Sequence, residues 1–287
     1  MSKSFPAEFS KMIDIKEKAK ELKKEMIKTI CRAGGGHMPA SLSIIDILTV
    51  LYYSTLQIDP DNSDDPHRDR FILSKGHACV ALYVVLADKG FFGKHHLTTY
   101  GKFGSILGGH PDMHKIPGVE ASTGSLGHGF PFGVGMALSG KLDDETYRVF
   151  TLLGDGECQE GSIWEAAMFA SHQKLDNLIA IIDYNKQQAM DYLDKIVSLE
   201  PFVEKWRAFG WEVREVDGHD LNQLIEIFNT CPFVKGKPNL IIAHTTKGKG
   251  ISFMEHEPLW HYRMPNLEEM KIVSKDLVLG DFWKEFE

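Results

Sequence analysis

The chain has 287 residues, of which 43% are hydrophobic and 25% are charged, and its net charge is −8. This composition is typical of a globular protein with a sizeable core, and the acidic balance without a basic cluster argues against a nucleic-acid partner. No apolar run approaches the roughly 20 residues of a membrane span, and residues 1–6 lack the apolar core of a signal peptide. The four cysteines are scattered with no Cys-x-x-Cys pair, so we expect a reduced protein of the cytoplasm.

Helices and a glycine-rich loop are predicted in the first half of the chain. Apolar residues at helical spacing predict a helix over residues 8–33, and the glycines at 34–36 end it because glycine adopts the necessary backbone angles cheaply. Two more helices are predicted over residues 44–56 and 77–88. Residues 101–140 are rich in glycine, and their front half is predicted to be a functional loop because it is long for a mere connection.

The second half of the chain alternates between strand and helix patterns. Apolar runs predict strands over residues 148–153, 178–183, 211–216 and 239–244. The segments between them predict helices over residues 161–172, 202–209 and 221–229. This alternation indicates an α/β fold with a mostly parallel sheet flanked by helices on both faces. No repeat, low-complexity segment or linker interrupts it, so we expect residues 1–287 to form a single domain.

An oxygen ligand follows each of two neighbouring predicted strands. Asp155, in Gly154-Asp155-Gly156-Glu157, comes directly after the first, and Asn185 comes 30 positions later at the end of the second. Both should lie at the carboxyl edge of the sheet, where open α/β sheets bind ligands. Carboxylate and amide oxygens suit Mg²⁺ or Ca²⁺ carrying a diphosphate. A lone Gly-Asp-Gly is most often a turn, so this spacing by itself leaves both interpretations open.

Four histidines lie in loops that contain glycine or proline. They are His37 after the triple glycine, His77 in Ser-Lys-Gly-His, His110 in Gly-Gly-His-Pro, and His261 in Leu-Trp-His. A single histidine is more often a surface or core residue than a catalytic one. Converging imidazoles, however, donate hydrogen bonds to diphosphate oxygens and move protons of substrate hydroxyls near neutral pH.

Ordered motifs along nearly the whole chain resemble those of a known family. They are Gly36-His37, Ser74-Lys75-Gly76-His77-Ala78, Gly109-His110-Pro111, Thr123-Gly124-Ser125-Leu126-Gly127, Gly154-Asp155-Gly156 with Glu160-Gly161, Asp183-Tyr184-Asn185-Lys186, and Trp260-His261. The Gly-Asp-Gly motif followed by 28 residues and Asn185 is similar to the thiamine-diphosphate signature. In all these motifs the chain resembles the N-terminal section of transketolases, which holds the diphosphate of thiamine diphosphate in a thiamine-diphosphate-binding fold.

The resemblance implies three sets of site residues. The metal ligands would be Asp155, Asn185 and the backbone carbonyl of Gln187, around Mg²⁺, with Ca²⁺ or Mn²⁺ as alternatives. The cofactor-binding residues would be His77, Gly124, Ser125, Leu126, Gly154, Asp155, Gly156, Glu157, Asn185 and His261. The catalytic residues that face the sugar would be His37, His77, His110 and His261.

The family's reaction transfers a two-carbon ketol unit from a ketose, phosphorylated or similarly anionic, to an aldose. Full-length members are more than twice this long, and their second domain binds the aminopyrimidine ring and supplies an activating glutamate. We therefore expect the pyrimidine-binding and C-terminal domains on a separate polypeptide, in an α2β2 assembly. The contact with that second polypeptide is expected at Trp164, Phe169 and the segment 127–135 with Phe130 and Phe132.

Departures from the family's pattern leave the donor sugar undefined. They are Gly-His-Met-Pro around His37, His128 in place of a common glutamine, the polar run at 187–190, and Tyr262 after His261. A phosphorylated, a sulfonated and a branched sugar all stay open.

Two alternative functions also stay open. A 1-deoxyxylulose-5-phosphate synthase shares the diphosphate motifs but is one long chain, and Gly109-His110-Pro111 fits the transketolase pattern better. A non-catalytic scaffold subunit is disfavoured, because Asp155, Asn185 and the histidines are all retained.

Overall fold

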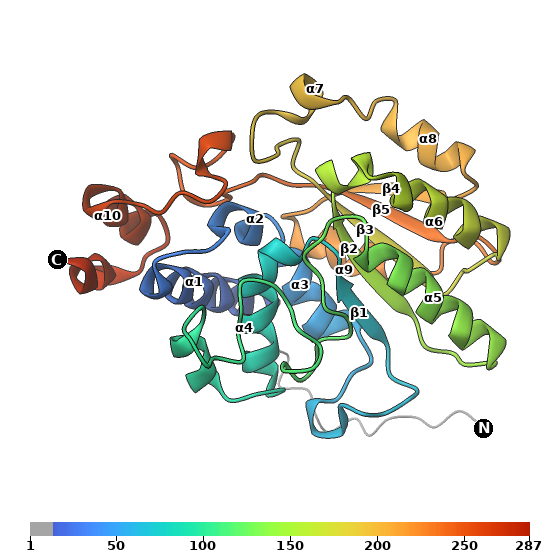
Figure 1. Ribbon diagram of the computed structural model, residues 1–287, viewed down its shortest axis with the longest axis horizontal. Helices are drawn as coiled ribbons and strands as arrows, with labels where there is room; N and C mark the ends of the chain where they lie inside the picture. The colour runs from blue at the N-terminus through green and yellow to red at the C-terminus, as the bar shows by residue number, and fades with distance from the viewer. Residues whose placement is uncertain (1–13) are drawn as a thin grey trace.

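A five-stranded sheet lies at the centre of the computed structural model, which describes residues 14–287 (Figure 1). Its strands are β1 (Arg70–Leu73), β2 (Val149–Gly154), β3 (Leu178–Tyr184), β4 (Glu212–Asp217) and β5 (Asn239–His244). They are arranged in the order β1-β2-β3-β5-β4, and every neighbouring pair is parallel. The predicted α/β fold with a parallel sheet is therefore confirmed. The four predicted strands are present to within one residue at each end, whereas the short β1 was not predicted.

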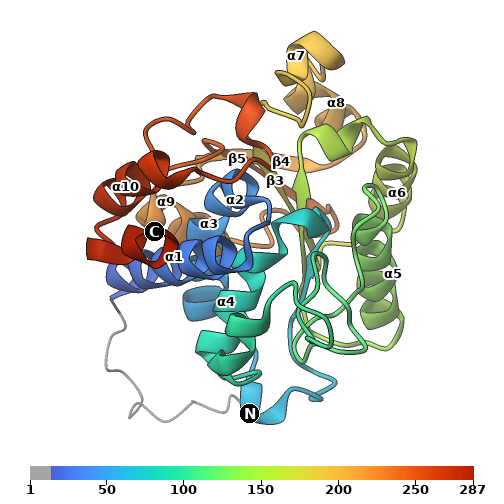
Figure 2. The same cartoon turned by 60° about the vertical axis from the view of Figure 1, so that its left-hand side comes forward.

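Ten helices surround the sheet in the described part of the chain. They are α1 (Ile15–Ala33), α2 (Met38–Leu42), α3 (Ile45–Val50), α4 (Cys79–Lys89), α5 (Gly129–Leu142), α6 (Gly161–His172), α7 (Leu193–Ile196), α8 (Phe202–Ala208), α9 (Leu221–Asn229) and α10 (Leu267–Asp276). Seen from the side, the sheet separates α1 to α4 from α5 and α6 (Figure 2). Within residues 14–287, no helix is both long enough and apolar enough to cross a membrane.

Each face of the sheet buries its own hydrophobic core. Along β2, Phe150 and Leu152 pack into the core that contains residues of α1, α3, α4 and α9. Val149 and Leu153, which point the other way, pack into the core that contains residues of α5, α6 and α8. Because both faces are buried, the strands have continuous apolar sequences rather than alternating ones.

Two predicted helices differ from those observed. α1 begins at Ile15 because the Asp14 carboxylate caps it, accepting from the amides of Lys16 and Glu17; residues 8–13 of the predicted helix lie outside the described residues. It ends, as predicted, at Gly34, whose φ of +69° is left-handed. The helix predicted over 44–56 is α3 followed by a turn of π-helix, Leu51–Thr55.

Of the aromatic residues expected at a partner-facing surface, Phe130 lies inside the protein, whereas Trp164 is only half-buried. Phe130 is 0% exposed and packs against Trp206 and Trp211, because it lies on the side of α5 that faces the sheet. The half-buried Trp164 donates its indole N–H to the Cys158 carbonyl at 2.8 Å. Phe132 and Phe169 are 53% and 44% exposed, so they remain on the outer surface of α5 and α6.

The register of the strands determines where the site residues lie. Gly154 is opposite Asp183, and Tyr184 is opposite His244. The residues that follow these strand ends, Asp155, Asn185 and Thr245, therefore come to the same edge of the sheet.

Candidate active site

A cavity of about 270 Å³ opens at the carboxyl edge of the sheet. Most of the predicted site residues line it, together with two lysines to which the sequence analysis gave no role. These lining residues are His37, Lys75, His77, Gly124, Leu126, Gly154, Asp155, Gly156, Glu157, Asn185, Gln187, Lys247 and His261. Ser125 is exposed and does not line the cavity, and His110 lies exposed near it.

Asp155 is held at the end of β2 by backbone donors. Its Oδ1 accepts from the Gly156 amide at 2.7 Å, and its Oδ2 accepts from the Lys186 amide. Lys186 has a φ of +64°, a left-handed conformation that is uncommon for a residue other than glycine. Burial, and then the negative charge of Asp183, raise the pKa of Asp155 to about 7. A divalent cation at this carboxylate would favour its ionised form.

The amide of Asn185 is oriented by its neighbours. Its Nδ2 donates to Asp183 Oδ2 at 2.9 Å, and its Oδ1 accepts from the Gln187 amide at 3.0 Å. Because an amide oxygen has two lone pairs, Oδ1 keeps one for a further partner. Residues 14–287 hold no cluster of three His, Cys, Asp or Glu side chains suited to a metal ion. A metal here would therefore be held by carboxylate, amide and backbone oxygens.

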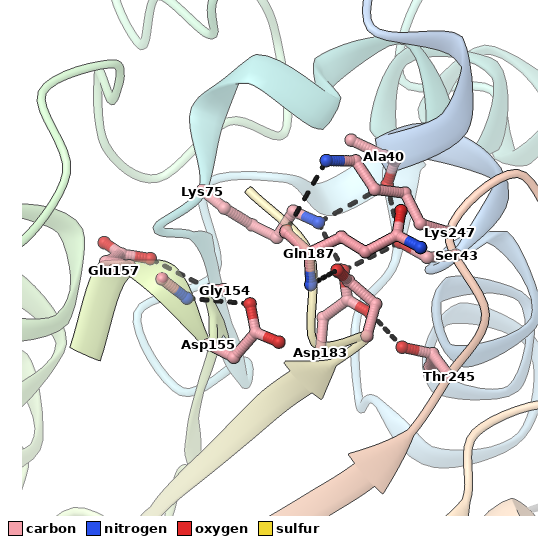
Figure 3. A network of polar contacts seen from close by, with 12 residues as sticks. Ala40, Ser43, Lys75, Gly154, Asp155, Glu157, Asp183, Gln187, Thr245 and Lys247 are labelled. Carbon is pink, nitrogen blue, oxygen red and sulfur yellow. Dashed lines mark hydrogen bonds and ion pairs between the residues drawn. The ribbon is translucent and has the colours of Figure 1, made fainter. Parts of the chain in front are cut away.

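Asp183 is the centre of a buried network beneath the cavity (Figure 3). Its carboxylate accepts from the Lys75 ammonium, from the hydroxyls of Ser43 and Thr245, and from Asn185. Burial by itself would raise the pKa of Asp183, but the charge of Lys75 and these hydrogen bonds hold it below its ordinary value. Lys75 and Asp183 both lie in motifs shared with the transketolases, but neither was predicted to be a site residue.

Lys247 supplies a second ammonium group to the cavity. Its Nζ donates to the Gln188 carbonyl at 3.1 Å and to His261 Nδ1 at 2.9 Å. Burial, and then the charge of Lys75, lower the pKa of Lys247 to about 8. Since the ammonium group can only donate, His261 accepts at Nδ1 and carries its own proton on Nε2.

The cavity has features that fit a bound diphosphate. The ammonium group of Lys247 suits an anion, whereas the charge of Lys75 is balanced by Asp183. A Cβ at Gly156 would lie 2.8 Å from the Gln188 side chain, so only glycine leaves the backbone open at this point. Gln188 Nε2 is buried without a hydrogen-bond partner among the described residues, and an oxygen of a bound anion would supply that partner.

Two of the predicted histidines, His77 and His261, lie close to His37, and His110 lies somewhat further from it. The His37 ring centroid lies 5.1 Å from that of His77, 5.0 Å from that of His261 and 6.5 Å from that of His110. Burial, and then the charges of neighbouring groups, lower the pKa of His37 to about 4 and that of His261 to about 3. The pKa of His77 is also well below its ordinary value, with burial again the largest cause. These three imidazoles are therefore neutral at pH 7.

Glu157 already has hydrogen-bond partners within the protein. Its Oε1 accepts from the Ser74 hydroxyl at 2.5 Å and the Gly127 amide at 2.9 Å, and its Oε2 accepts from the Gly154 amide at 3.1 Å. Burial raises the pKa of this carboxyl, and these hydrogen-bond donors offset the raise only in part. Glu157 therefore joins the ends of β1 and β2 to the loop before α5.

A parallel sheet that ends in these carboxylate and amide side chains, in one cavity with lysines and neutral histidines, fits a thiamine-diphosphate-binding domain. Comparison with protein families gives the particular family. Residues 15–271 match the family described as transketolase, thiamine diphosphate binding domain, so the chain belongs to the transketolases.

The similar proteins include subunits of transketolases. One subunit of the apulose-4-phosphate transketolase of Phocaeicola vulgatus is 44% identical over 255 residues, which cover 89% of this chain and 90% of that protein. The SqwG subunit of the 6-deoxy-6-sulfo-D-fructose transketolase of a Clostridium species is 45% identical over 258 residues, covering 90% of this chain and 94% of that protein.

Full-length transketolases match over only part of their length. The crystal structure of Campylobacter jejuni transketolase superposes with a TM-score of 0.86 at 30% identity, and the match covers 92% of this chain and 42% of that one. The predicted resemblance to the diphosphate-binding part of a transketolase, and the prediction of a transketolase subunit that uses thiamine diphosphate, are confirmed by these matches.

Proposed function

We propose that this chain, together with a separate partner subunit, catalyses the transfer of a two-carbon ketol unit from an anionic ketose to an aldose. The observation that carries the proposal is the position of Asp155 and Asn185 at adjacent strand ends, where they line the same cavity as the neutral histidines. The high coverage of two relatives named as transketolase subunits supports the two-chain arrangement.

A divalent metal ion, Mg²⁺ in the first instance, would be held by Asp155, by Asn185 Oδ1 and by the backbone carbonyl of Gln187. Hard oxygen ligands of these kinds suit Mg²⁺, and Ca²⁺ or Mn²⁺ as substitutes. The diphosphate would be held by His77, His261 and the backbone at Gly156. Lys247 would add positive charge within the same cavity.

The histidines would provide the proton transfers of the reaction. Thiamine diphosphate, when bound, supplies the electron sink for breaking and forming the carbon–carbon bond. His37, neutral at pH 7, would accept a hydroxyl proton from the sugar. His261, whose Nδ1 accepts from Lys247, would donate from Nε2 to the carbonyl oxygen of the sugar. His110, exposed near His37, would bind the sugar where it enters.

The names of two relatives indicate the chemical class of the substrate. One is named for apulose 4-phosphate and another for 6-deoxy-6-sulfo-D-fructose, and both sugars carry an anionic group. We therefore propose an anionic ketose as donor and leave phosphate and sulfonate as alternatives. The α2β2 assembly, the single diphosphate-binding domain and a cytoplasmic location are further proposals, the last because all four cysteines are free thiols.

The proposal is tested by reconstitution. The purified chain is mixed with its partner subunit, thiamine diphosphate and Mg²⁺, and ketol transfer is measured with phosphorylated and sulfonated ketoses. We expect transfer from at least one anionic ketose, and none when Mg²⁺ is removed by a chelator. Cofactor binding by the complex without any ketol transfer would favour the non-catalytic scaffold instead.

A further inference from the structure

We propose that His219 is a positioning residue for the cofactor site. From its place outside the cavity, His219 holds the loop that carries Thr245 and Lys247. The inference rests on the proposed function, because the loop matters only if the cavity binds the diphosphate. His219 does not line the cavity, and it belongs to none of the motifs that indicated the family.

The two ring nitrogens of His219 have different partners. Nδ1 lies 2.9 Å from Asp46 Oδ2, and Nε2 lies 2.9 Å from the backbone nitrogen of Thr246. A backbone N–H can only donate, so Nε2 must be the unprotonated acceptor and Nδ1 must carry the hydrogen that Asp46 accepts. The side chains of His219 and Asp46 are 12% and 9% exposed, so water competes little for either hydrogen bond.

The loop held by His219 contacts the site through the residues on both sides of Thr246. Thr245, one residue earlier, donates its hydroxyl to Asp183, and Lys247, one residue later, places its ammonium group in the cavity. The turn before His219 approaches this loop closely, since a Cβ at Gly218 would lie 2.4 Å from the Thr245 methyl group. Glycine is therefore needed at 218 for the contact between the turn and the loop.

Asp46 connects this contact to the helical layer. It lies in the first turn of α3, and Lys23 of α1 places its ammonium group 3.6 Å from the Asp46 carboxylate. Ser43, just before α3, donates to Asp183 Oδ2 at 2.7 Å. The segment 43–46 thus supports both the buried Asp183 network and, through His219, the loop at 245–247. Loss of the His219 side chain should let Thr245 and Lys247 move together.

The test compares substitutions at His219 with a matched control. In H219F the acceptor for the Thr246 amide is lost, whereas in H219Q an amide oxygen can take the place of Nε2. His244 is the control, because it also pairs with a carboxylate, Glu215 at 2.7 Å, but on the exposed surface. The dissociation constant of thiamine diphosphate is measured by calorimetry in Mg²⁺ on the complex with the partner subunit, and turnover is measured at saturating cofactor.

We expect H219F to raise the dissociation constant of thiamine diphosphate about 10-fold. Losses of this size are found when a residue that orients the ligands of a metal ion is removed. H219Q should return to within about threefold of wild type, and turnover at saturating cofactor should change less than binding does. H244F should bind as wild type. A purely structural role would lower the melting temperature of H219F and H219Q alike without this difference in binding.

Several outcomes would overturn the inference: a wild-type dissociation constant in H219F, equal weakening in H219Q and H219F, or equal weakening in H244F. Should H219F not fold, D46A removes the partner that orients the imidazole, and unchanged binding in folded D46A would also reject the inference. A wild-type complex that binds no thiamine diphosphate would instead reject the proposed function, and the inference with it.

Discussion

Lys75 and Asp183 form an ion pair that is almost completely withdrawn from solvent, with side chains 2% and 0% exposed. The pair connects the loop after β1 to the end of β3, directly below the cavity. Removing two charges from water is costly, and the arrangement is stable only because hydroxyl and amide donors also bind the carboxylate. The buried network around Asp183 therefore contributes to the stability of the fold as well as to the site.

Lys75→Met should lower the free energy of unfolding by about 3–5 kcal/mol, the usual cost of leaving one partner of a buried pair unpaired. Urea denaturation of the cofactor-free protein measures the change. Lys195→Met is the matched control, because Lys195 and Asp191 form a pair that is 61% and 44% exposed. Such a pair contributes at most about 1 kcal/mol. Equal losses in the two variants would show that the buried pair has no special importance.

Asp155→Ala should abolish Mg²⁺-dependent binding of thiamine diphosphate, because it removes the carboxylate proposed to hold the cation. Calorimetry on the reconstituted complex measures the binding, and circular dichroism verifies that the fold is intact. Asp194→Ala, on the exposed side of α7, should bind normally. Undiminished binding in the Asp155 variant would remove this residue from the metal site.

Alanine at His37, His110 or His261 should each lower turnover by roughly 100-fold or more, as expected for groups that transfer protons in the transition state. His67, His95 and His172 are exposed and lie outside the site, so their alanine variants serve as controls. Steady-state assays at saturating thiamine diphosphate compare the two sets. Equal effects in both would mean that the losses arise from the structure and not from catalysis.

The cofactor-free protein should lose stability as the pH falls from about 6.5 towards 4. The pKa values of His37 and His261 are lowered to about 4 and about 3, so between these values and the ordinary pKa near 6.5 the unfolded chain binds more protons. Stability therefore rises with pH in this window and falls on acidification. Urea midpoints at pH 7 and pH 4.5 measure the loss, which should be smaller in the double variant H37Q/H261Q. An identical pH dependence in both proteins would contradict the assignment.

Without its partner the chain should show no ketol transfer, and addition of the partner should restore activity up to an equimolar ratio. The proposed partner would supply the glutamate that activates the cofactor. Phe132→Asp should weaken the association, because this 53% exposed ring lies near the start of α5. Leu142→Asp, at the other end of α5 and 74% exposed, is the control. Robust turnover by the chain with the partner rigorously excluded would reject the two-subunit proposal.

The sequence predicted the sheet better than the polar support of the site. Strands β2, β3 and β5 are buried on both faces, so their continuous apolar runs mark their ends to within one residue. The four-residue β1 is too short for such a pattern. Motifs in the loops pointed to Asp155 and Asn185 because each follows a predicted strand. They pointed to His37, His77 and His110 because each follows a glycine.

The residues that sequence reasoning missed depend on distant partners. Lysine is a residue type that is normally exposed. Lys75 is buried because it pairs with Asp183, and Lys247 is buried because it lines the cavity. Phe130 and Phe132 are two positions apart on α5, so one faces the core and the other faces outward. The local sequence does not show which of the two rings faces the core.

The strand order has a consequence for the synthesis of the protein. β5 lies between β3 and β4, so among the described residues β4 pairs only with a strand that is made after it. While a nascent chain ends before residue 239, the turn with His219 has no neighbouring strand and the loop at 245–247 does not exist. Pairing of strands distant in the sequence is a late and slow event in folding. Binding of the cofactor would therefore begin only once the last strand is in place, which makes the bound cofactor a marker of completed folding.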